Sequence, residues 1–316
     1  MSAQPLKALV AAVLAASALT AATPASAATY PLHAARVVQH FDLEKGQTPE
    51  SMVFAPDGTA YVTFAKARQI AAISPSGRIR VLATLPAPAD GGVNTPALGF
   101  ALTVGIDRAA DGTLYFAYAT GTSDLTGIWS LRPGGTPRRI AALPATSLPN
   151  GIALGHRTLY AADSTGGVIW QVPVSGGKAT TWSSDQELAA AGFLGANGLR
   201  LRDGAVWATN LDKGTILRIP VQADGSAGRL KVVATGLAGI DDFAFTGRGT
   251  EIIAALDTVN QVALVRPDGS HTVVLTAADG LQGPTTVAVR GRTVHVPSAA
   301  YLTGQDPNLL RAQLGR

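Results

Sequence analysis

The sequence repeats one short pattern along most of its length, and this repetition limits the possible folds more than any other feature. Each copy holds up to four apolar runs rich in β-branched and aromatic residues, separated by turns of Gly, Pro, Asn and Asp. Such runs predict consecutive antiparallel strands. The copies begin at Glu50, Val104, Asn150, Asn197, Asp241 and Thr285. Four-stranded units that recur about every 40–50 residues are typical of a β-propeller.

Six copies predict an all-β, six-bladed propeller with four antiparallel strands per blade. The sixth copy is short of strands, and its remaining extended segment is Leu309–Leu314. The segment Ala35–Leu43 has strand character but no hairpin partner beside it. We therefore expect this N-terminal strand to complete the sixth blade and close the ring, which removes a free sheet edge. A helix over 306–314 is the alternative, because Asp306-Pro307 is a good helix start.

The first residues are typical of a secretion signal. Lys7 precedes an apolar run over 8–22, and Ala25-Ser26-Ala27 is a small-residue cleavage pattern. The apolar run is shorter than the roughly 20 residues that a membrane-spanning helix needs. We predict a signal peptide over 1–27 and a single propeller domain over 28–316. We expect a secreted or periplasmic protein with no stable membrane insertion after cleavage.

Composition excludes several functional classes. Hydrophobic residues make up 47% of the chain and charged residues 15%, which favours a large core over disorder. The net charge of +4 is spread without a basic run, so nucleic acid is not an expected partner. The absence of cysteine excludes disulfides and thiolate metal sites. No G-x-S-x-G elbow or P-loop is present. We expect a monomer that acts on a small molecule.

The residues that open the first strand of each copy form a column with metal-binding chemistry. The first strand of a propeller blade lines the central channel, so these side chains should converge at one channel mouth. Four of them carry oxygen donors: Glu50, Asn150, Asn197 and Asp241. Hard oxygen ligands that include carboxylates suit Ca²⁺ better than zinc, although other divalent ions are possible. The alternative is that Asn and Asp simply start strands after turns.

A second column of polar residues ends the second strand of three copies. It comprises Asp163, Asn210 and Asp257, which should return to the same face of the ring. Because Asp and Asn commonly cap turns, a structural role is the alternative here. Two long joins, 86–98 and 184–196, should lie on this face too, and the second has room for one helical turn. They are candidate lids, and the alternative is that their length reflects loop drift without a function.

The motifs around the first column resemble those of a known superfamily. They read Thr48-Pro49-Glu50, Leu148-Pro149-Asn150-Gly151, Ala196-Asn197-Gly198-Leu199 and Gly239-Ile240-Asp241-Asp242. They are similar to the six-bladed propellers of the gluconolactonase, regucalcin and paraoxonase superfamily. The resemblance implies a channel Ca²⁺ held by Glu50, Asn150, Asn197 and Asp241, and hydrolysis of lactones. Two departures are the apolar Val104 in the second copy and the lack of a paraoxonase-type histidine pair.

These observations lead to two functional hypotheses. The first is an exported, calcium-dependent hydrolase of lactones or related esters, in which the metal polarises the carbonyl and stabilises the oxyanion. A carboxylate would take a proton from the attacking water, with Asp241 or Asp242 as first choice and Asp163 as second. The second hypothesis is a non-catalytic propeller, plugged by calcium, that serves as a ligand-binding or protein-interaction scaffold.

Overall fold

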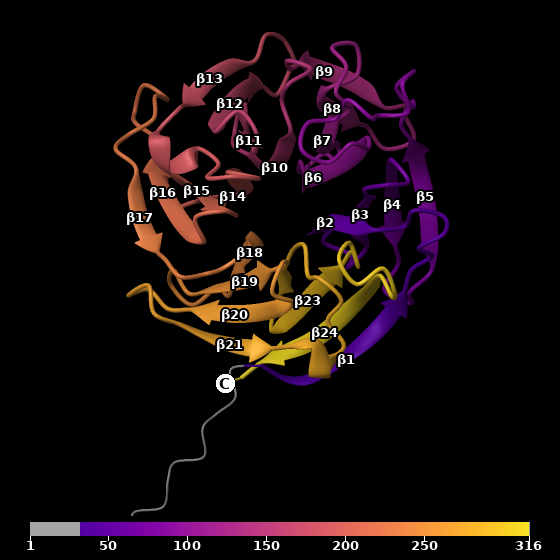
Figure 1. The fold of residues 1–316 in the computed structure, drawn as a ribbon, viewed down its shortest axis with the longest axis vertical. Coiled ribbons are helices and arrows are strands. Elements are labelled where there is room, and N and C mark those ends of the chain that lie inside the picture. The colour runs from indigo at the N-terminus through magenta and orange to yellow at the C-terminus, as the bar shows by residue number, and fades with distance from the viewer. Residues whose placement is uncertain (1–31, 316) are drawn as a thin grey trace, which may run out of the picture.

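The protein is a ring of six four-stranded antiparallel sheets around a central channel (Figure 1). The structure is a computed structural model that describes residues 32–315. The prediction of an all-β, six-bladed propeller is confirmed. The predicted signal peptide over 1–27 lies outside the described residues. No helix in the described range has the length and apolar character needed to cross a membrane.

Each blade runs from an inner strand at the channel to an outer strand at the rim. Blade 1 contains β2 (Pro49–Phe54), β3 (Ala60–Phe64), β4 (Gln69–Ile73) and β5 (Ile79–Thr84). Blade 2 contains β6 (Leu102–Arg108), β7 (Leu114–Ala119), β8 (Gly127–Leu131) and β9 (Arg138–Ala142). Blade 3 contains β10 (Pro149–Leu154), β11 (Thr158–Asp163), β12 (Val168–Pro173) and β13 (Thr180–Ser183).

The second half of the ring follows the same plan. Blade 4 contains β14 (Ala196–Arg202), β15 (Ala205–Asn210), β16 (Thr215–Pro220) and β17 (Lys231–Ala234). Blade 5 contains β18 (Ile240–Phe245), β19 (Ile252–Leu256), β20 (Gln261–Val265) and β21 (His271–Leu275). Blade 6 contains β22 (Ala288–Arg290), β23 (Thr293–Ser298), β24 (Asn308–Leu314) and β1 (Leu32–His40). Two 3-10 helices, η1 (Gln186–Leu188) and η2 (Ala277–Asp279), lie in the connections.

The hydrophobic core lies between the blades and not inside any one of them. Each sheet is apolar on both faces, and all six residues of β7 are buried as a result. One cluster of buried side chains fills the space between each pair of neighbouring blades. Phe116 and Trp129, for example, pack toward Ile70 of the preceding blade. Because a blade buries one face against each neighbour, a ring that closes covers every face.

The N-terminal strand closes the ring, as predicted. In the sixth sheet the strand order is β1-β24-β23-β22, so β1 is the outer strand of a blade otherwise made by the C-terminus. Figure 1 shows β1 beside β24 at the rim. Leu310 and Leu314 of β24 are buried in the cluster between blades 5 and 6 together with Leu32. The alternative of a helix over 306–314 is wrong, because this segment pairs with strands on both sides.

We expect removal of β1 to open the ring. A chain that starts at residue 41 exposes the edge of β24 and should aggregate. Its melting temperature should fall by at least about 10 °C, since each kcal/mol lost shifts Tm by about 2–4 °C in large domains. Scanning calorimetry and light scattering measure both effects, and a chain that starts at residue 32 is the control. A monomeric truncated protein with an unchanged Tm would show that β1 does not stabilise the ring.

Candidate functional site

A β-bulge at the start of the inner strand turns the first-column residues toward the channel. In blades 1 to 5 the pairing of the inner strand with its neighbour shifts register at this point. The column residues sit inside the shift: Glu50, Val104, Asn150, Asn197 and Asp241. A bulge re-aims a side chain relative to the regular pleat. The repeated bulge is therefore the local structure behind the column that the sequence shows.

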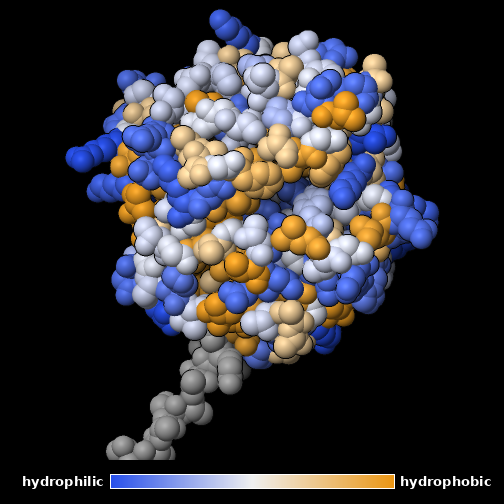
Figure 2. All heavy atoms as spheres, viewed as in Figure 1, coloured by the Kyte–Doolittle hydropathy of each residue, from blue (hydrophilic) through white to orange (hydrophobic). Residues whose placement is uncertain are grey.

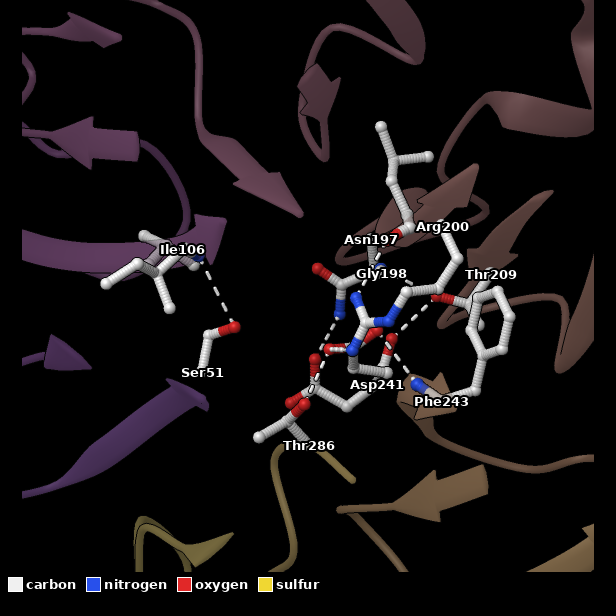
Figure 3. A network of polar contacts seen from close by, with 12 residues as sticks. Ser51, Ile106, Asn197, Gly198, Arg200, Thr209, Asp241, Phe243 and Thr286 are labelled. Atoms are coloured by element: carbon white, nitrogen blue, oxygen red, sulfur yellow. Dashed lines mark hydrogen bonds and ion pairs between the residues drawn. The ribbon is translucent and has the colours of Figure 1, made fainter. Parts of the chain in front are cut away.

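Hydroxyl groups from neighbouring blades hold these bulges in place. Thr209 of β15 accepts a hydrogen bond from Gly198 N in its own blade and donates one to Asp241 O in the next blade, at 2.7 and 2.6 Å. Thr63 bridges Ser51 N and Val104 O in the same way, at 3.0 and 2.7 Å. Each bridge satisfies backbone groups that the bulge removes from the sheet. The preceding blade thus holds the backbone of Val104 and of Asp241 in place, and Figure 3 shows the second of these bridges.

Glycine follows the column residue wherever the inner strands approach most closely. A Cβ at Gly105 would fall within 3 Å of the backbone of residues 150–152, and a Cβ at Gly151 would meet the next inner strand in the same way. A Cβ at Gly198 would overlap the Asp242 side chain. The X-Gly dipeptides of the motifs therefore allow neighbouring inner strands to pack closely around the channel.

The first column lines one pocket, of about 240 Å³, at a mouth of the channel. Polar side chains from separate blades form part of it: Glu50, Asn150, Asn197, Asp241 and Asp257. Its other walls are mainly apolar: Leu98, Phe100, Leu102, Val104, Leu148, Phe193, Leu194, Leu211 and Leu302. Phe193 is 47% exposed and Leu302 is 69% exposed. Both predicted long joins contribute to the lining, through Leu98 and Phe193. The second join contains the helical turn η1.

Viewed along the channel, the molecular surface is hollowed at the centre of the ring. Figure 2 shows hydrophilic residues in the hollow and hydrophobic residues at several places around it. Polar groups within an apolar surround are typical of small-molecule sites.

Two sets of hydrogen bonds orient the column inside the pocket. The Asn197 amide donates from Nδ2 to Asp241 Oδ1 at 2.8 Å, and its Oδ1 accepts from Ser164 Oγ at 3.1 Å. The Tyr301 hydroxyl donates to Glu50 Oε2 at 2.6 Å. Tyr301 lies in the loop between β23 and β24, next to Ala300, whose φ of 58° is uncommon for a residue other than glycine. Sequence reasoning missed Tyr301, because no other copy contains a counterpart of this loop.

The pocket concentrates buried carboxyl groups. Burial raises the pKa of Glu50 to about 8, and the charges of Asp257 and Asp242 act in the same direction. Burial also raises the pKa of Asp241 well above its usual range, with further contributions from Glu50, Asp257 and Asp242. Burial raises the pKa of Asp257 to about 6. None of Glu50, Asp241 and Asp257 forms an ion pair within residues 32–315.

One basic residue, Lys66, also lines the pocket. Its ammonium group lies 5.1 Å from the ring centroid of Phe100 and 5.6 Å from that of Tyr301. These distances are those of cation–π contacts. The lysine therefore packs against the aromatic rings and leaves the carboxyl groups without a salt bridge.

Asp242 is held away from the pocket. Its Oδ2 accepts from Arg200 at 2.7 Å and from Thr286 Oγ1 at 2.6 Å, and its Oδ1 accepts from Phe243 N at 2.8 Å. The pocket lining does not include it. Figure 3 shows the Arg200 and Thr286 side chains converging at this point beside Asp241. The carboxylate that we predicted as a base is thus occupied by an ion pair and two further hydrogen bonds.

Two residues of the second column bind backbone groups of turns and loops, and the third lines the pocket. The Asp163 carboxylate accepts hydrogen bonds from Leu148 N, Gly166 N and Trp170 Nε1 at 2.9–3.0 Å, so it satisfies a turn. Asn210 donates from Nδ2 to Glu187 O and Ala189 O of the long join, and its Oδ1 accepts from Lys213 N. Neither residue lines the pocket, whereas Asp257 does. The geometry supports the capping alternative for Asp163 over the role of a base.

The residues present fit a hard divalent cation. Glu50 and Asp241 supply carboxylate oxygens, and Asn150 and Asn197 supply amide oxygens, as calcium sites require. The Oδ1 atom of Asp257 is buried and has no hydrogen-bond partner within the described chain, so the pocket holds unsatisfied anionic character. Across residues 32–315, no three His, Cys, Asp or Glu side chains group closely enough to hold a metal by themselves. A cation bound here would therefore need the amide oxygens of Asn150 and Asn197 as well as the carboxylates.

Solved structures share this architecture at low sequence identity. A catalytically inactive variant of virginiamycin B lyase from Staphylococcus aureus, with quinupristin, is 19% identical with a TM-score of 0.61, covering 85% of this chain and 82% of that one. Regucalcin from Agrobacterium tumefaciens, a calcium-binding protein, is 17% identical with a TM-score of 0.63, covering 89% and 96%. A gluconolactonase from Xanthomonas campestris is 13% identical with a TM-score of 0.63, covering 90% and 95%.

This chain shares their propeller fold. The resemblance noted from the sequence motifs is thereby confirmed at the level of architecture. At these identities the likeness extends to the fold alone, and the activities belong to the proteins named. Neither the known protein-family models nor the curated protein sequences give a match to this chain.

The buried acids predict an unusual dependence of propeller stability on pH. Because the pKa of Glu50 in the folded protein is about 8, above its ordinary value of 4.5, the folded state binds the proton more tightly. This contribution is complete below the ordinary value and is lost as pH rises through about 8. In chelator, the free energy of unfolding should therefore fall between pH 5 and 9. The fall is about 1.4 kcal/mol for every tenfold difference in proton affinity between the folded and unfolded states.

Glu50→Gln tests this dependence because it removes the titrating group and keeps an acceptor for Tyr301. Denaturant unfolding between pH 5 and 9 should show a flatter profile and a higher stability above pH 8 for this variant. Glu44→Gln, at an exposed carboxylate, is the control and should follow the unchanged protein. Parallel profiles for Glu50→Gln and the unchanged protein would mean that Glu50 is ionised throughout.

Proposed function

We propose that the protein is a calcium-dependent hydrolase of lactones or related esters. The convergence of Glu50, Asn150, Asn197 and Asp241 beneath an apolar cavity, with the acids free of ion pairs in the described chain, carries the proposal. A bound divalent cation would polarise the ester carbonyl and offset the charge of the oxyanion. The likeness to a gluconolactonase and to regucalcin supports the choice of reaction and of metal.

Glu50, Asn150, Asn197 and Asp241 would hold the metal, each through an oxygen from a different blade. The Tyr301 hydroxyl orients Glu50 through Oε2, which leaves Oε1 for the cation. Asn197 now presents Nδ2 to Asp241, so it becomes a ligand when its amide turns over and directs Oδ1 to the cation. Ser164 can follow this turn because a hydroxyl both donates and accepts.

Asp257 is the best-placed general base. It lines the same pocket as the ligand set, whereas Asp242 and Asp163 are tied by hydrogen bonds. Its pKa of about 6 leaves it ionised at neutral pH and still able to take a proton. In the proposed reaction Asp257 accepts the proton of a water molecule while the water oxygen attacks the ester carbonyl. The same proton then passes to the alkoxide that leaves when the ester C–O bond breaks.

The walls of the pocket favour an apolar substrate. Leu98, Phe100 and Phe193 lie in or beside the long joins, and Leu302 stands exposed at the rim. Such side chains gain from burying an alkyl or aromatic group and offer no hydrogen bonds to sugar hydroxyls. We propose lactones with an aliphatic or aromatic substituent as substrates. We also propose that the protein works outside the cytoplasm, on the basis of the sequence of residues 1–27. That it is a monomer stays a prediction.

Two variants should distinguish the residues that bind the metal from the residue that acts as general base. Calcium at about one hundred times its Kd should stabilise the protein by about 2.7 kcal/mol, and chelator should abolish both this gain and turnover. Glu50→Gln should weaken calcium binding, because it removes a formal charge from the ligand set. Asp257→Asn should retain most of the calcium-dependent rise in Tm while turnover falls by about 100-fold or more, as for loss of a general base.

Asp107→Asn is the matched control, since Asp107 is a half-buried carboxylate that lies outside the pocket. It should leave both calcium binding and turnover intact. Calorimetric titration and a lactone hydrolysis assay measure the two properties. A calcium-dependent Tm without turnover of any lactone would favour the non-catalytic scaffold, and a Tm insensitive to chelator would overturn the metal site.

The substrate preference has its own test. Leu302→Ser should lower kcat/KM for a lactone with an alkyl chain by about tenfold, because it removes apolar contact at the rim. It should change kcat/KM for a sugar lactone little. Leu201→Ser is the control, since Leu201 is an exposed leucine at the other channel mouth. Equal losses for both substrates, or a higher kcat/KM for the sugar lactone in the unchanged protein, would contradict the apolar assignment.

A further inference from the structure

A second cavity lies at the seam where the two ends of the chain meet. This seam cleft, of about 290 Å³, opens between blades 1 and 6. Its lining residues are Val38, Gln39, Phe54, Gly58, Ala60, Ile73, Ser74, Pro75, Ser76, Gly77, Arg290, Thr293, His295, Leu309 and Arg311. The turns that border it join first to second and third to fourth strands. In an up-and-down blade these turns lie on the opposite face of the ring from the candidate active site.

The charged groups of the seam cleft are all basic. Arg290 and Arg311 line it, and no acidic residue of the described range does. Neither arginine forms an ion pair with an acid in the described chain. Asp57, on the adjoining turn, accepts a hydrogen bond from Thr59 N and does not pair with Arg290. The cleft therefore carries a positive charge that Asp57, which lies outside its lining, offsets only in part.

The strand register adds a third arginine to this charge. Arg311 of β24 lies directly opposite Arg36 of β1 on one side and opposite His295 of β23 on the other. Like charges directly opposite each other destabilise a pair of strands. The pair Arg36–Arg311 lies at the junction that closes the ring, where such a cost would weaken closure. An anion close to Arg311 would offset it.

His295 supplies an unsatisfied polar atom in the same cleft. The residue is 9% exposed, and its Nδ1 is buried without a hydrogen-bond partner within residues 32–315. Its ring lies 4.6 Å from that of Phe54, centroid to centroid. Burial, followed by the charges of Arg311 and Arg290, lowers the pKa of His295 to about 4. The neutral ring adds no positive charge to the cleft and carries a single N–H.

We propose that the seam cleft binds a small organic anion, with a carboxylate or phosphate group attached to an apolar body. Arg290 and Arg311 would hold the anionic group, since guanidinium forks match both geometries. The hydroxyls of Ser74 and Ser76 border the same space. Phe54 and the aliphatic side chains of the lining would contact the apolar body. The volume lies near the lower end of the range for ligand pockets, about 300–1,000 Å³, which limits the ligand to a small molecule.

Binding at this place would strengthen closure of the ring. The lining draws on β1, on blade 1 and on the C-terminal strands of blade 6. Arg290 already reaches across the seam, where it donates to Pro56 O at 3.1 Å. A ligand that contacts all three parts binds the closed ring better than an open one, and so stabilises it.

The test uses phenyl phosphate, benzoate and inorganic phosphate as probes, with neutral benzyl alcohol for comparison. Calorimetric titration at pH 7.5 in the presence of chelator keeps any calcium at the other face out of the measurement. We expect saturable binding of phenyl phosphate or benzoate and a rise in Tm, and no binding of benzyl alcohol. Inorganic phosphate, which lacks the apolar body, should bind more weakly than phenyl phosphate. The double variant Arg290→Gln with Arg311→Gln should bind at least tenfold more weakly.

Two further measurements test whether binding occurs at the seam cleft: probe binding by a control variant, and the Tm of Arg311→Gln with and without probe. Arg80→Gln changes an exposed arginine of β5 outside the cleft and should bind like the unchanged protein. Without probe, Arg311→Gln should have a Tm no lower than the unchanged protein, because it relieves the repulsion from Arg36. With probe it should have the lower Tm. Absence of saturable anion binding, or an equal loss of binding in Arg80→Gln, would overturn the proposal.

Discussion

Every blade of this protein is apolar on both faces, so no blade is stable until a neighbour covers each face. A closed ring meets this requirement for all six similar units at once. The buried clusters lie between blades for that reason, and each draws on two sheets. Closure by β1 is part of the same requirement, since Leu32 enters the cluster between blades 5 and 6.

The candidate active site also depends on contacts between blades. Thr209 and Thr63 each tie the bulge of their own inner strand to the bulge of the next. The four proposed ligands come from four separate blades, so no continuous segment contains the site. The arrangement costs stability in the absence of a cation, because it buries carboxylates whose pKa values are raised. Such local cost is common where a site is prepared for a ligand.

The repeat made most of the architecture predictable from the sequence. Contacts between residues distant in the sequence could not be predicted in this way. The six blades, the role of the N-terminal strand and the column from Glu50 to Asp241 followed from the spacing of the copies, and the structure gathers the column in one pocket. Its function as a metal site stays a prediction, because the fold permits that chemistry without requiring it. Asp242 looked available for catalysis, but Arg200 and Thr286 from neighbouring blades occupy its carboxylate. Arg200 and Thr286 are distant from Asp242 in the sequence, and an alignment of the copies does not show that their side chains meet it.

The pairing of β1 with β24 has a consequence for how the molecule is assembled. β1 is the first strand of the described chain and pairs with the last one, so it stays unpaired until β24 has been synthesised. From then until the ring closes, both strands present open hydrogen-bonding edges of matching register. At high concentration, β1 of one copy can pair with β24 of another and produce exchanged dimers or longer chains of molecules. Dilute refolding favours the monomeric ring, because closure within one chain does not depend on concentration.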